Sequence, residues 1–299
     1  MRERGFILLI VIWLAALFAL VTAGFVKAIQ AHLRASTSFA QSARAELLAD
    51  SGLALAALDL VGNGPASGRS RRFPLNATPV ACALDSEGQL TIRLQDAGGR
   101  VNLNTASERL LQALLIGLGV ERSVAIQRVD ALIEFRSPPG EGRRPGAEKV
   151  DYVAAGRPLG AKNAPLDNLD ELYQVPGFDA ALIEQMTPHI TIHSGTAGLD
   201  PEVTTPGLAG QLARAVSDLP GGAQGLNSDT RVPGEFIIAS TQRVFVATVA
   251  ARLETGAGYV REAVIELAQN KNGLLNYKVW KRGAVGIPPD EANGLAPPC

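Results

Sequence analysis

Hydrophobic residues form one uninterrupted block near the start of the chain. Residues 6–26 read FILLIVIWLAALFALVTAGFV, 21 positions without a charged side chain. A helix of this length rises about 30 Å, the thickness of the hydrocarbon core of a bilayer. Farther on, apolar residues such as Leu47 and Leu58 recur at helical intervals between charged ones. The pattern predicts one continuous helix over residues 6–61, apolar on all sides at first and amphipathic afterwards.

Two arginines indicate how this helix would lie in a membrane. Arg2 and Arg4 precede the apolar block, and positive charge on the short side favours a cytoplasmic N-terminus. A cleaved secretory signal is the alternative, although such a signal has only about 7–15 apolar residues and ends in small residues at its cleavage site. We expect a retained anchor that crosses the membrane once.

The segment after the helix predicts a loop and a hairpin. Residues 62–79 are rich in Gly, Pro, Ser and Arg, which is typical of a loop. Residues 80–84 and 90–94 alternate apolar and polar side chains around a turn at 85–88. Residues 101–104 alternate in the same way, and they predict another short strand.

The middle of the chain has helical periodicity and turns that contain Gly and Pro. Residues 110–119 and 123–135 predict one helix–turn–helix, and residues 170–177 and 180–186 predict another. The turn residues are Gly117 and Gly119 in the first unit, and Pro176 and Gly177 in the second. Each unit has the form of a helix-hairpin-helix.

The rest of the chain returns to strand periodicity. Predicted strands lie at 189–193, 235–240, 244–253, 260–268 and 274–282, the last of them at a sheet edge, and 288–299 is predicted to be a frayed tail. Strands on both sides of a helical block indicate one sheet into which a helical domain is inserted. The expected fold class is α+β.

Composition narrows the range of functions. The chain has 28 Lys and Arg against 29 Asp and Glu, a net charge of −1, which argues against a protein that mainly neutralises phosphates. Two cysteines and three histidines argue against a Cys/His zinc cluster. The sequence has no GxSxG, HExxH or Walker motif, and no third metal ligand is apparent near His189 and His193. We expect no enzymatic activity.

The junction MRERG|FILLIVIW resembles the processing site of type IV pilins and type II secretion pseudopilins. The resemblance implies that a prepilin peptidase cuts after Gly5 and that Phe6 becomes a methylated N-terminus. Trp13 and Phe18 then belong to the membrane and assembly helix. Members of this family usually carry Glu at the fifth mature position, where this chain has Ile10. The missing Glu is a trait of the minor pseudopilin K, which sits at the tip of the fibre.

A longer match lies in the middle of the chain. The segments GGRVNLNTASERLLQALL, IEFR, GAEKVDY, NAP and LDELYQVPGF, in this order, resemble type II secretion minor pseudopilin K. The resemblance implies a pilin fold, in which a long N-terminal helix packs on an antiparallel sheet and a large helical domain (helix-hairpin-helix or SAM-like) is inserted. The expected divisions are a leader at 1–5, the helix at 6–62, the first part of the sheet at 63–100, the inserted domain at 101–222, and the second part of the sheet with the tail at 223–299.

The same resemblance implies a structural role in protein secretion. The chain would assemble with minor pseudopilins of the I and J types and with the major pseudopilin into a periplasmic pseudopilus, forming its tip and helping to start its assembly. Prepilin peptidase and the inner-membrane assembly platform are the other expected partners. The implied location is the bacterial inner membrane, with a cytoplasmic N-terminus and a periplasmic head.

A membrane-anchored DNA-binding protein of a competence-like system is the alternative. VNLNTAS followed by a helix-hairpin-helix also resembles competence DNA receptors, and the turns of such hairpins offer backbone N–H groups to phosphate. Phosphate binding needs basic neighbours, however, and residues 163–213 contain neither Lys nor Arg. We therefore expect no nucleic-acid partner.

The sequence alone leaves two further questions open, calcium binding and a disulfide. The family resemblance suggests calcium in the inserted domain, with Glu148 and Asp151 as candidate ligands, but the neighbouring loop has arginines where the family has aspartates. We favour surface ion pairs there and expect no required cofactor. Cys82 and Cys299 both reach the oxidising periplasm in this topology, yet the sequence leaves open whether they form a disulfide.

Overall fold

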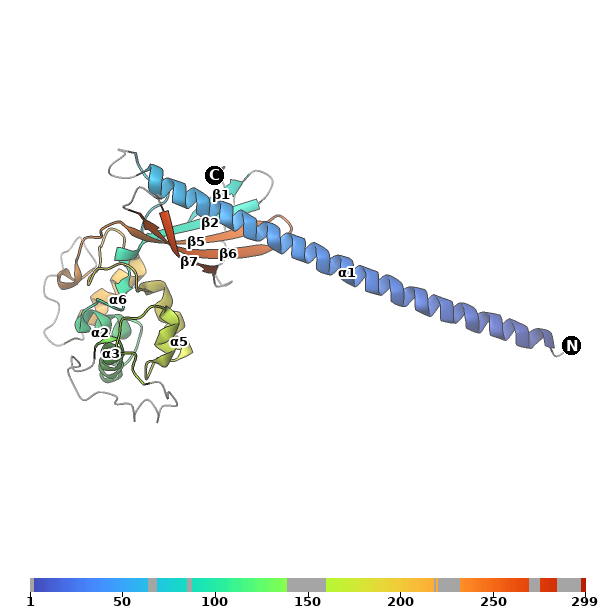
Figure 1. Ribbon diagram of the computed structural model, residues 1–299, viewed down its shortest axis with the longest axis horizontal. Helices are drawn as coiled ribbons and strands as arrows, with labels where there is room; N and C mark the ends of the chain where they lie inside the picture. Colours follow the sequence, from blue (N-terminus) through green and yellow to red (C-terminus); the bar gives the residue numbers. More distant parts are fainter. Residues whose placement is uncertain are drawn as a thin grey trace.

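The computed structural model describes residues 3–63, 69–84, 88–138, 160–217, 219, 232–268, 275–283 and 297–299. Its longest element is α1 (Glu3–Gly62), a single 60-residue helix that projects far beyond the head (Figure 1). No proline interrupts these residues, so every turn of the helix can keep its backbone hydrogen bonds. The structure therefore has the continuous helix that the sequence predicts.

The head is built on a five-stranded antiparallel sheet. Its strands are β1 (Val80–Leu84), β2 (Gly88–Asp96), β5 (Val244–Leu253), β6 (Gly258–Leu267) and β7 (Leu275–Arg282), and they lie in the order β1-β2-β5-β6-β7. β2 and β5 pair along their whole length, from Gly88 opposite Leu253 to Asp96 opposite Phe245. The centre of the sheet thus joins strands from before and after the helical part of the chain.

The second half of α1 covers one face of this sheet. It contacts β2, β5 and β6, as Figure 1 shows. The buried apolar side chains of the helix are Ala45, Leu48, Ala49, Leu53, Ala56, Ala57 and Leu60. At Gly52 a Cβ atom would lie only 2.7 Å from Val249 Cγ1. The small residues on this face let the helix approach the strands closely.

A helical block separates β2 from β5. It contains α2 (Glu108–Gly117), α3 (Arg122–Arg136), η2 (Leu169–Gln174), α5 (Ala180–Met186), η3 (Thr187–His189) and α6 (Pro206–Ser217), and it is flanked by η1 (Ala97–Gly99) and η4 (Gly234–Phe236). Two short strands, β3 (Val101–Asn102) before α2 and β4 (Ile190–Thr191) between η3 and α6, pair in parallel. The block has a core of its own, separate from the core between α1 and the sheet.

The starts of the helices in this block follow local capping rules. The Ser107 side chain accepts a hydrogen bond from the Leu110 N–H and caps α2, and Asp179 caps α5 in the same way through Leu182. Such a side chain satisfies one of the unpaired N–H groups at a helix start. Local sequence therefore sets where these helices begin.

A buried polar network joins the helical block to the sheet. Asp96, at the end of β2, accepts hydrogen bonds from the Gly98 N–H (2.7 Å) and the Ser240 hydroxyl (2.6 Å) through Oδ1. Asp200, from the helical block, accepts the Ser240 N–H at 2.8 Å. Burial raises the pKa of Asp96. Because the three segments share these bonds, the network fixes how the block sits on the sheet.

Several predicted elements are wrong in their details. The strand predicted at 235–240 is the 3-10 helix η4, and only Ile237 forms a bridge, to Leu199. The strand predicted at 189–193 shrinks to the two residues of β4, because His189 closes η3. The first half of the second hairpin is the 3-10 helix η2, not an α-helix. Each of these segments is short, so its conformation depends on contacts with the rest of the fold and not on its own sequence.

The tail prediction is also wrong where the structure describes the tail. Cys299 forms a disulfide with Cys82, its N–H donates to Ala83 O at 2.9 Å, and Pro298 bridges to Ala83 in parallel. The Arg72 guanidinium donates to the carbonyl groups of Pro298 and Cys299. The end of the tail is therefore fixed against the outer side of β1.

The fold class predicted from the sequence is confirmed. A long N-terminal helix packs on an antiparallel sheet, further helices complete a mixed α+β molecule, and the head sits at the C-terminal end of the helix (Figure 1).

Candidate functional site

The first half of α1 is an exposed apolar rod. Its most apolar 18-residue stretch has a mean hydropathy of 2.6, and none of it is buried. Trp13, Phe18 and Ile10 are 72%, 63% and 47% exposed. Gly5 and Phe6 lie in the first turns of the same helix. By length and composition this helix can cross a membrane, and it offers apolar side chains in every direction to lipid or to other helices.

A buried arginine holds the second half of α1 on the sheet. Arg261, on β6, donates to Asp50 Oδ1 and to Glu46 Oε1, each at 2.6 Å. Its side chain is 7% exposed, whereas those of Glu46 and Asp50 are 44% and 30% exposed. The Tyr259 hydroxyl also donates to Glu46, at 3.2 Å. These contacts, which we call the Arg261 clamp, connect α1 to the head.

The charges of this clamp reinforce one another. The hydrogen bond from Arg261 lowers the pKa of the Glu46 carboxyl. Burial acts against the charge of Arg261, but the hydrogen bonds to Asp50 and Glu46 outweigh it and raise the pKa of the guanidinium. The guanidinium also stacks over the Tyr259 and Trp280 rings, 4.9 and 5.1 Å from their centroids. Cation–π contact stabilises a guanidinium that is withdrawn from water.

The outward face of α1 above the sheet is apolar as well. Leu47 and Leu58 are 66% and 68% exposed, and Val61 is 38% exposed. These residues face away from the buried stripe of the helix. Apolar side chains grouped on an exposed face are typical of protein–protein contact.

The glycine turns of the two hairpins pack against their own block. Gly117 lies close to the Gln211 backbone of α6, where a Cβ would come within 3.0 Å of the Gln211 carbonyl oxygen. Gly119 and Gly177 have φ values of +90° and +84°, a conformation that favours glycine. A Cβ at Gly177, which follows Pro176, would lie 2.9 Å from Arg128 Cγ of α3. Close packing at Gly117 and Gly177, and a positive φ at Gly119 and Gly177, thus explain the glycines at these turns.

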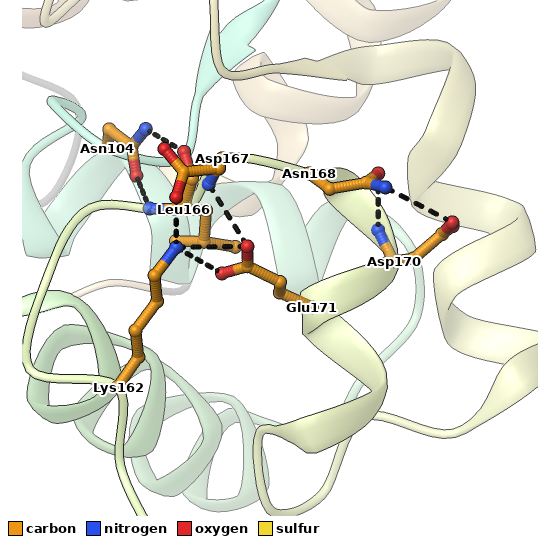
Figure 2. A network of polar contacts seen from close by, with 7 residues as sticks. All are labelled: Asn104, Lys162, Leu166, Asp167, Asn168, Asp170 and Glu171. Carbon is orange, nitrogen blue, oxygen red and sulfur yellow. Dashed lines mark hydrogen bonds and ion pairs between the residues drawn. The ribbon is translucent and has the colours of Figure 1, made fainter.

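The Lys162 ammonium group binds the acidic segment that contains Asp167 and Glu171. Lys162 Nζ lies 2.7 Å from Asp167 Oδ2, and 2.9 and 2.8 Å from the two carboxylate oxygens of Glu171 (Figure 2). Burial acts to lower the pKa of Lys162, but the hydrogen bonds to these carboxylates raise it. Asn104 continues the network, because its side chain exchanges two hydrogen bonds with the Leu166 backbone (Figure 2).

The candidate calcium ligands Glu148 and Asp151 lie outside the described residues. Within the described ranges, no group of three or more His, Cys, Asp or Glu side chains could hold a metal ion. His189 and His193 are both half-buried, and burial lowers the pKa of each. His189 lies in η3 and His193 beyond β4, so neither belongs to a strand, although the sequence predicts one over 189–193.

Sequence reasoning missed two residues, Arg261 and Lys162, whose ion pairs hold separate segments of the chain together. Arg261 interrupts the apolar alternation of its predicted strand, and that interruption is a usable signal. Lys162 is the only Lys or Arg between Arg157 and Arg214, which could have directed attention to the carboxylates that follow it. The carboxylates that pair with these two residues could not be identified without the fold.

Comparisons with known proteins agree with this geometry. A family model described as "Type II secretion system (T2SS), protein K" matches residues 77–195. "Type II secretion system protein K" from Klebsiella pneumoniae is 27% identical over 135 residues, which are 41% of this chain and 38% of that relative. The match thus spans well under half the length of the curated relative.

A solved structure extends the likeness to most of the chain. One chain in "The Crystal Structure of the GspK-GspI-GspJ complex from enterotoxigenic Escherichia coli Type 2 Secretion System" matches 85% of this chain and 99% of its own length, with a TM-score of 0.53 and 19% identity. At this identity the structural match concerns the fold. The family model and the curated relative show that residues 77–195 and the matched 135 residues are similar to type II secretion system protein K.

Proposed function

We propose that this chain forms the tip of a periplasmic pseudopilus and helps to initiate its assembly. One observation carries the proposal: the exposed apolar half of α1 and the clamped half are one continuous helix, which joins a membrane segment rigidly to the head. Such a helix recruits the chain to the membrane and packs with other helices there. The large helical block gives the head a bulk suited to an end position.

The apolar residue Ile10 supports the tip position that we propose for this subunit. An ordinary pseudopilin has a carboxylate at this position, which pairs with the N-terminal amine of a neighbour inside the membrane. An unpaired charge there is expensive, and an apolar residue avoids that cost when no neighbour supplies the amine. A subunit at the end of the fibre lacks one such neighbour.

The proposed topology follows from the charges and the disulfide. Arg2 and Arg4 favour a cytoplasmic N-terminus, and the bacterial inner membrane is then crossed once. The head lies in the periplasm, where the disulfide between Cys82 and Cys299 persists. Prepilin peptidase would cut after Gly5 and leave Phe6 as the methylated N-terminus.

The proposed partners follow from the solved relative. That structure is a complex of GspK with GspI and GspJ, and we infer equivalent partners of the I and J types for this chain. The major pseudopilin and the inner-membrane assembly platform complete the set. The role is assembly rather than catalysis, and it needs no nucleic acid.

We further propose that the inserted domain does not depend on calcium. Lys162 already supplies positive charge to Asp167 and Glu171, and the loop before Glu148 contains Arg143 and Arg144. A thermal melt of the chain with millimolar calcium should match a melt with chelator, because an ion that does not bind the native state cannot stabilise it. A calcium-dependent rise that disappears in Asp151→Ala would contradict this.

Mass spectrometry of the mature protein from cells tests the proposed function. A chain that begins with methylated Phe6 is expected. A chain that begins at Met1, or one cut near Ala28 as a secretory signal would be, would overturn the pseudopilin topology.

A further inference from the structure

The part of α1 that follows the apolar segment carries only positive charge. Between Glu3 and Glu46 the sequence contains no Asp or Glu. Beyond residue 26, the Lys and Arg residues of this interval are Lys27, Arg34 and Arg44. All three are exposed, and the structure gives none of their side chains an ion pair or a hydrogen bond with another described residue. The helix therefore has uncompensated positive charge directly after its apolar part.

Lys27 and Arg34 lie on one side of the helix. They are seven residues apart, which is close to two full turns and about 10 Å along the axis. Gln30 is exposed on the same side between them, and its amide adds hydrogen-bond donors. We call these three residues the basic stripe. From residue 9 onward the first buried side chain of α1 is Ala45, so the stripe lies on the part of the helix that projects beyond the head (Figure 1).

The position of the stripe matches the headgroup layer of a bilayer. The apolar residues 6–26 span the hydrocarbon core of about 30 Å, and the headgroups add about 5–8 Å on each side. Lys27 then lies at the inner boundary of that layer, and Arg34 lies just beyond its outer boundary. Long basic side chains can bend toward the phosphates from both positions. Arg44 lies about 15 Å farther along the helix, which is too far to reach the headgroups.

We propose that the basic stripe binds the phosphate groups of anionic phospholipids in the leaflet from which α1 leaves the membrane. Charge complementarity selects this occupant, because the next acidic residue of the helix, Glu46, is 12 residues beyond Arg34 and is bound to Arg261. Guanidinium and ammonium groups form strong, charge-assisted hydrogen bonds with phosphate. Each Lys or Arg close to an anionic membrane surface strengthens binding about fivefold, whereas a zwitterionic lipid offers no net charge.

The lipid contact deepens the proposed membrane anchor, and its choice of leaflet rests on the proposed function. Cleavage after Gly5 removes Arg2 and Arg4, so the charged side chains of the mature chain near the membrane lie on the periplasmic side. The stripe then fixes the depth of α1. Moving the helix outward takes Lys27 away from the phosphates, and moving it inward brings Lys27 into the hydrocarbon, where a charge is expensive. A subunit that leaves the membrane for a fibre must break this contact.

Lipid binding to the full chain tests the stripe. The chain in a neutral detergent is titrated with phosphatidylglycerol, which is anionic, or with phosphatidylcholine, which is zwitterionic, and native mass spectrometry counts the bound lipids. We expect phosphatidylglycerol to bind at least tenfold more tightly. Lys27→Gln and Arg34→Gln should each weaken its binding about fivefold and leave the binding of phosphatidylcholine unchanged. Arg44→Gln is the matched control, because it removes the same charge from the same helix beyond the headgroups, and its effect should be less than twofold.

The outcomes separate this inference from the proposed function. Equal affinities for the two lipids overturn the stripe. A loss in Arg44→Gln as large as that in Arg34→Gln also overturns it, because a general effect of charge then explains the binding. Both outcomes leave the pseudopilin role intact, since that role is tested by the N-terminus of the mature chain. A mature chain that begins at Met1 overturns the proposed function and the choice of leaflet together.

Photocrosslinking identifies the occupant in cell membranes. The crosslinker is placed singly at Gln30, in the stripe, or at Ala43, which is exposed beside Arg44. Mass spectrometry should find phospholipid adducts at Gln30 and at least fivefold fewer at Ala43. Adducts of Gln30 with protein alone would assign the stripe to an acidic partner chain and overturn the lipid as its occupant.

Discussion

At the scale of single residues, polar side chains in apolar surroundings determine how distant segments of the chain are placed relative to one another. Arg261 lies on a strand face that is otherwise apolar, and Asp96 lies 1% exposed at the end of β2. A local violation of patterning in a natural protein marks a site with a specific role. The sequence can reveal such a violation, but the partners Glu46, Asp50 and Ser240 come from distant segments that only the fold brings together.

Loss of the Arg261 clamp should weaken the attachment of α1 to the head. Arg261→Met keeps a long apolar side chain but removes the guanidinium donor from both Glu46 and Asp50, and Glu46 keeps only the Tyr259 hydroxyl. Hydrogen bonds to charged groups contribute about 1.5–3 kcal/mol each at buried sites, and water weakens those of Arg261 because Glu46 and Asp50 are 44% and 30% exposed. We therefore expect a total loss of only about 1–3 kcal/mol in the free energy of unfolding. Urea unfolding of the detergent-solubilised chain measures it.

An exposed ion pair on the same sheet is the matched control. Lys281 lies 3.7 Å from Glu262, and its side chain is 51% exposed. Because exposed pairs contribute little, Lys281→Met should change the unfolding free energy by less than about 0.5 kcal/mol. Equal losses in the two variants would show that Arg261 has no special role.

The Asp96 carboxyl should make stability depend on pH. Burial, assisted by the charge of Asp200, raises its pKa, so the folded chain binds this proton more tightly than the unfolded chain. The contribution of Asp96 to the free energy of unfolding therefore increases as the pH falls through the folded-state pKa toward the unfolded-state value of about 3.9. Asp96→Asn can keep the Oδ1 hydrogen bonds from Gly98 and Ser240 without the buried charge.

Urea unfolding of wild type and Asp96→Asn between pH 4 and pH 8 tests this effect. We expect the variant to be the more stable near pH 8, with the difference shrinking toward pH 4. The contributions of His189 and His193 cancel in the comparison, since both chains contain them. A difference that is constant with pH would show that Asp96 does not titrate in this window.

At the scale of elements, length decides which predictions succeed. The helix α1 and the long strands β5 and β6 were predicted with nearly correct limits, because many alternating or periodic residues specify each of them. The segments that became η2, β4 and η4 contain two to six residues, and such short segments follow the contacts of the surrounding fold. The N-caps at Ser107 and Asp179 show that local chemistry still fixes helix starts.

Gly52 tests how closely α1 must approach the sheet. A larger side chain there meets Val249 Cγ1 and the Leu90 methyl groups, and overpacking of this kind costs about 1–3 kcal/mol. We expect Gly52→Leu to lower the free energy of unfolding by that amount. Ala54→Leu, two residues on and exposed, should stay within about 0.5 kcal/mol of wild type. Unfolding in urea compares them, and equal stabilities would mean that the helix does not need close contact at Gly52.

At the scale of the whole molecule, the sequence predicts an inserted helical block but not how the parts are locked together. The Asp96 network fixes the block to the sheet, the Arg261 clamp fixes the helix to the sheet, and the disulfide closes a loop with a sequence separation of 217 residues. Each lock joins segments that are far apart in sequence. Pairing over such separations leaves no local pattern, which is why the sequence left the disulfide open and missed the other two.

The position of the whole subunit in a fibre can be tested at Ile10. Ile10→Glu places a carboxylate in the membrane, which costs about 2.5–3.5 kcal/mol on insertion scales if nothing pairs with it. At the tip no neighbour above supplies an amine, so assembly and secretion should be unchanged or weakened. Ile12→Glu is the matched control, since it introduces the same charge at similar depth but away from the position that ordinary subunits use.

Labelled subunits show where each variant goes. For a tip subunit, Ile10→Glu and Ile12→Glu should behave alike, with label confined to fibre ends in both. If Ile10→Glu instead spreads along the shaft while Ile12→Glu does not, the restored carboxylate has found an amine partner inside the fibre. The missing glutamate would then be what keeps the subunit out of the shaft.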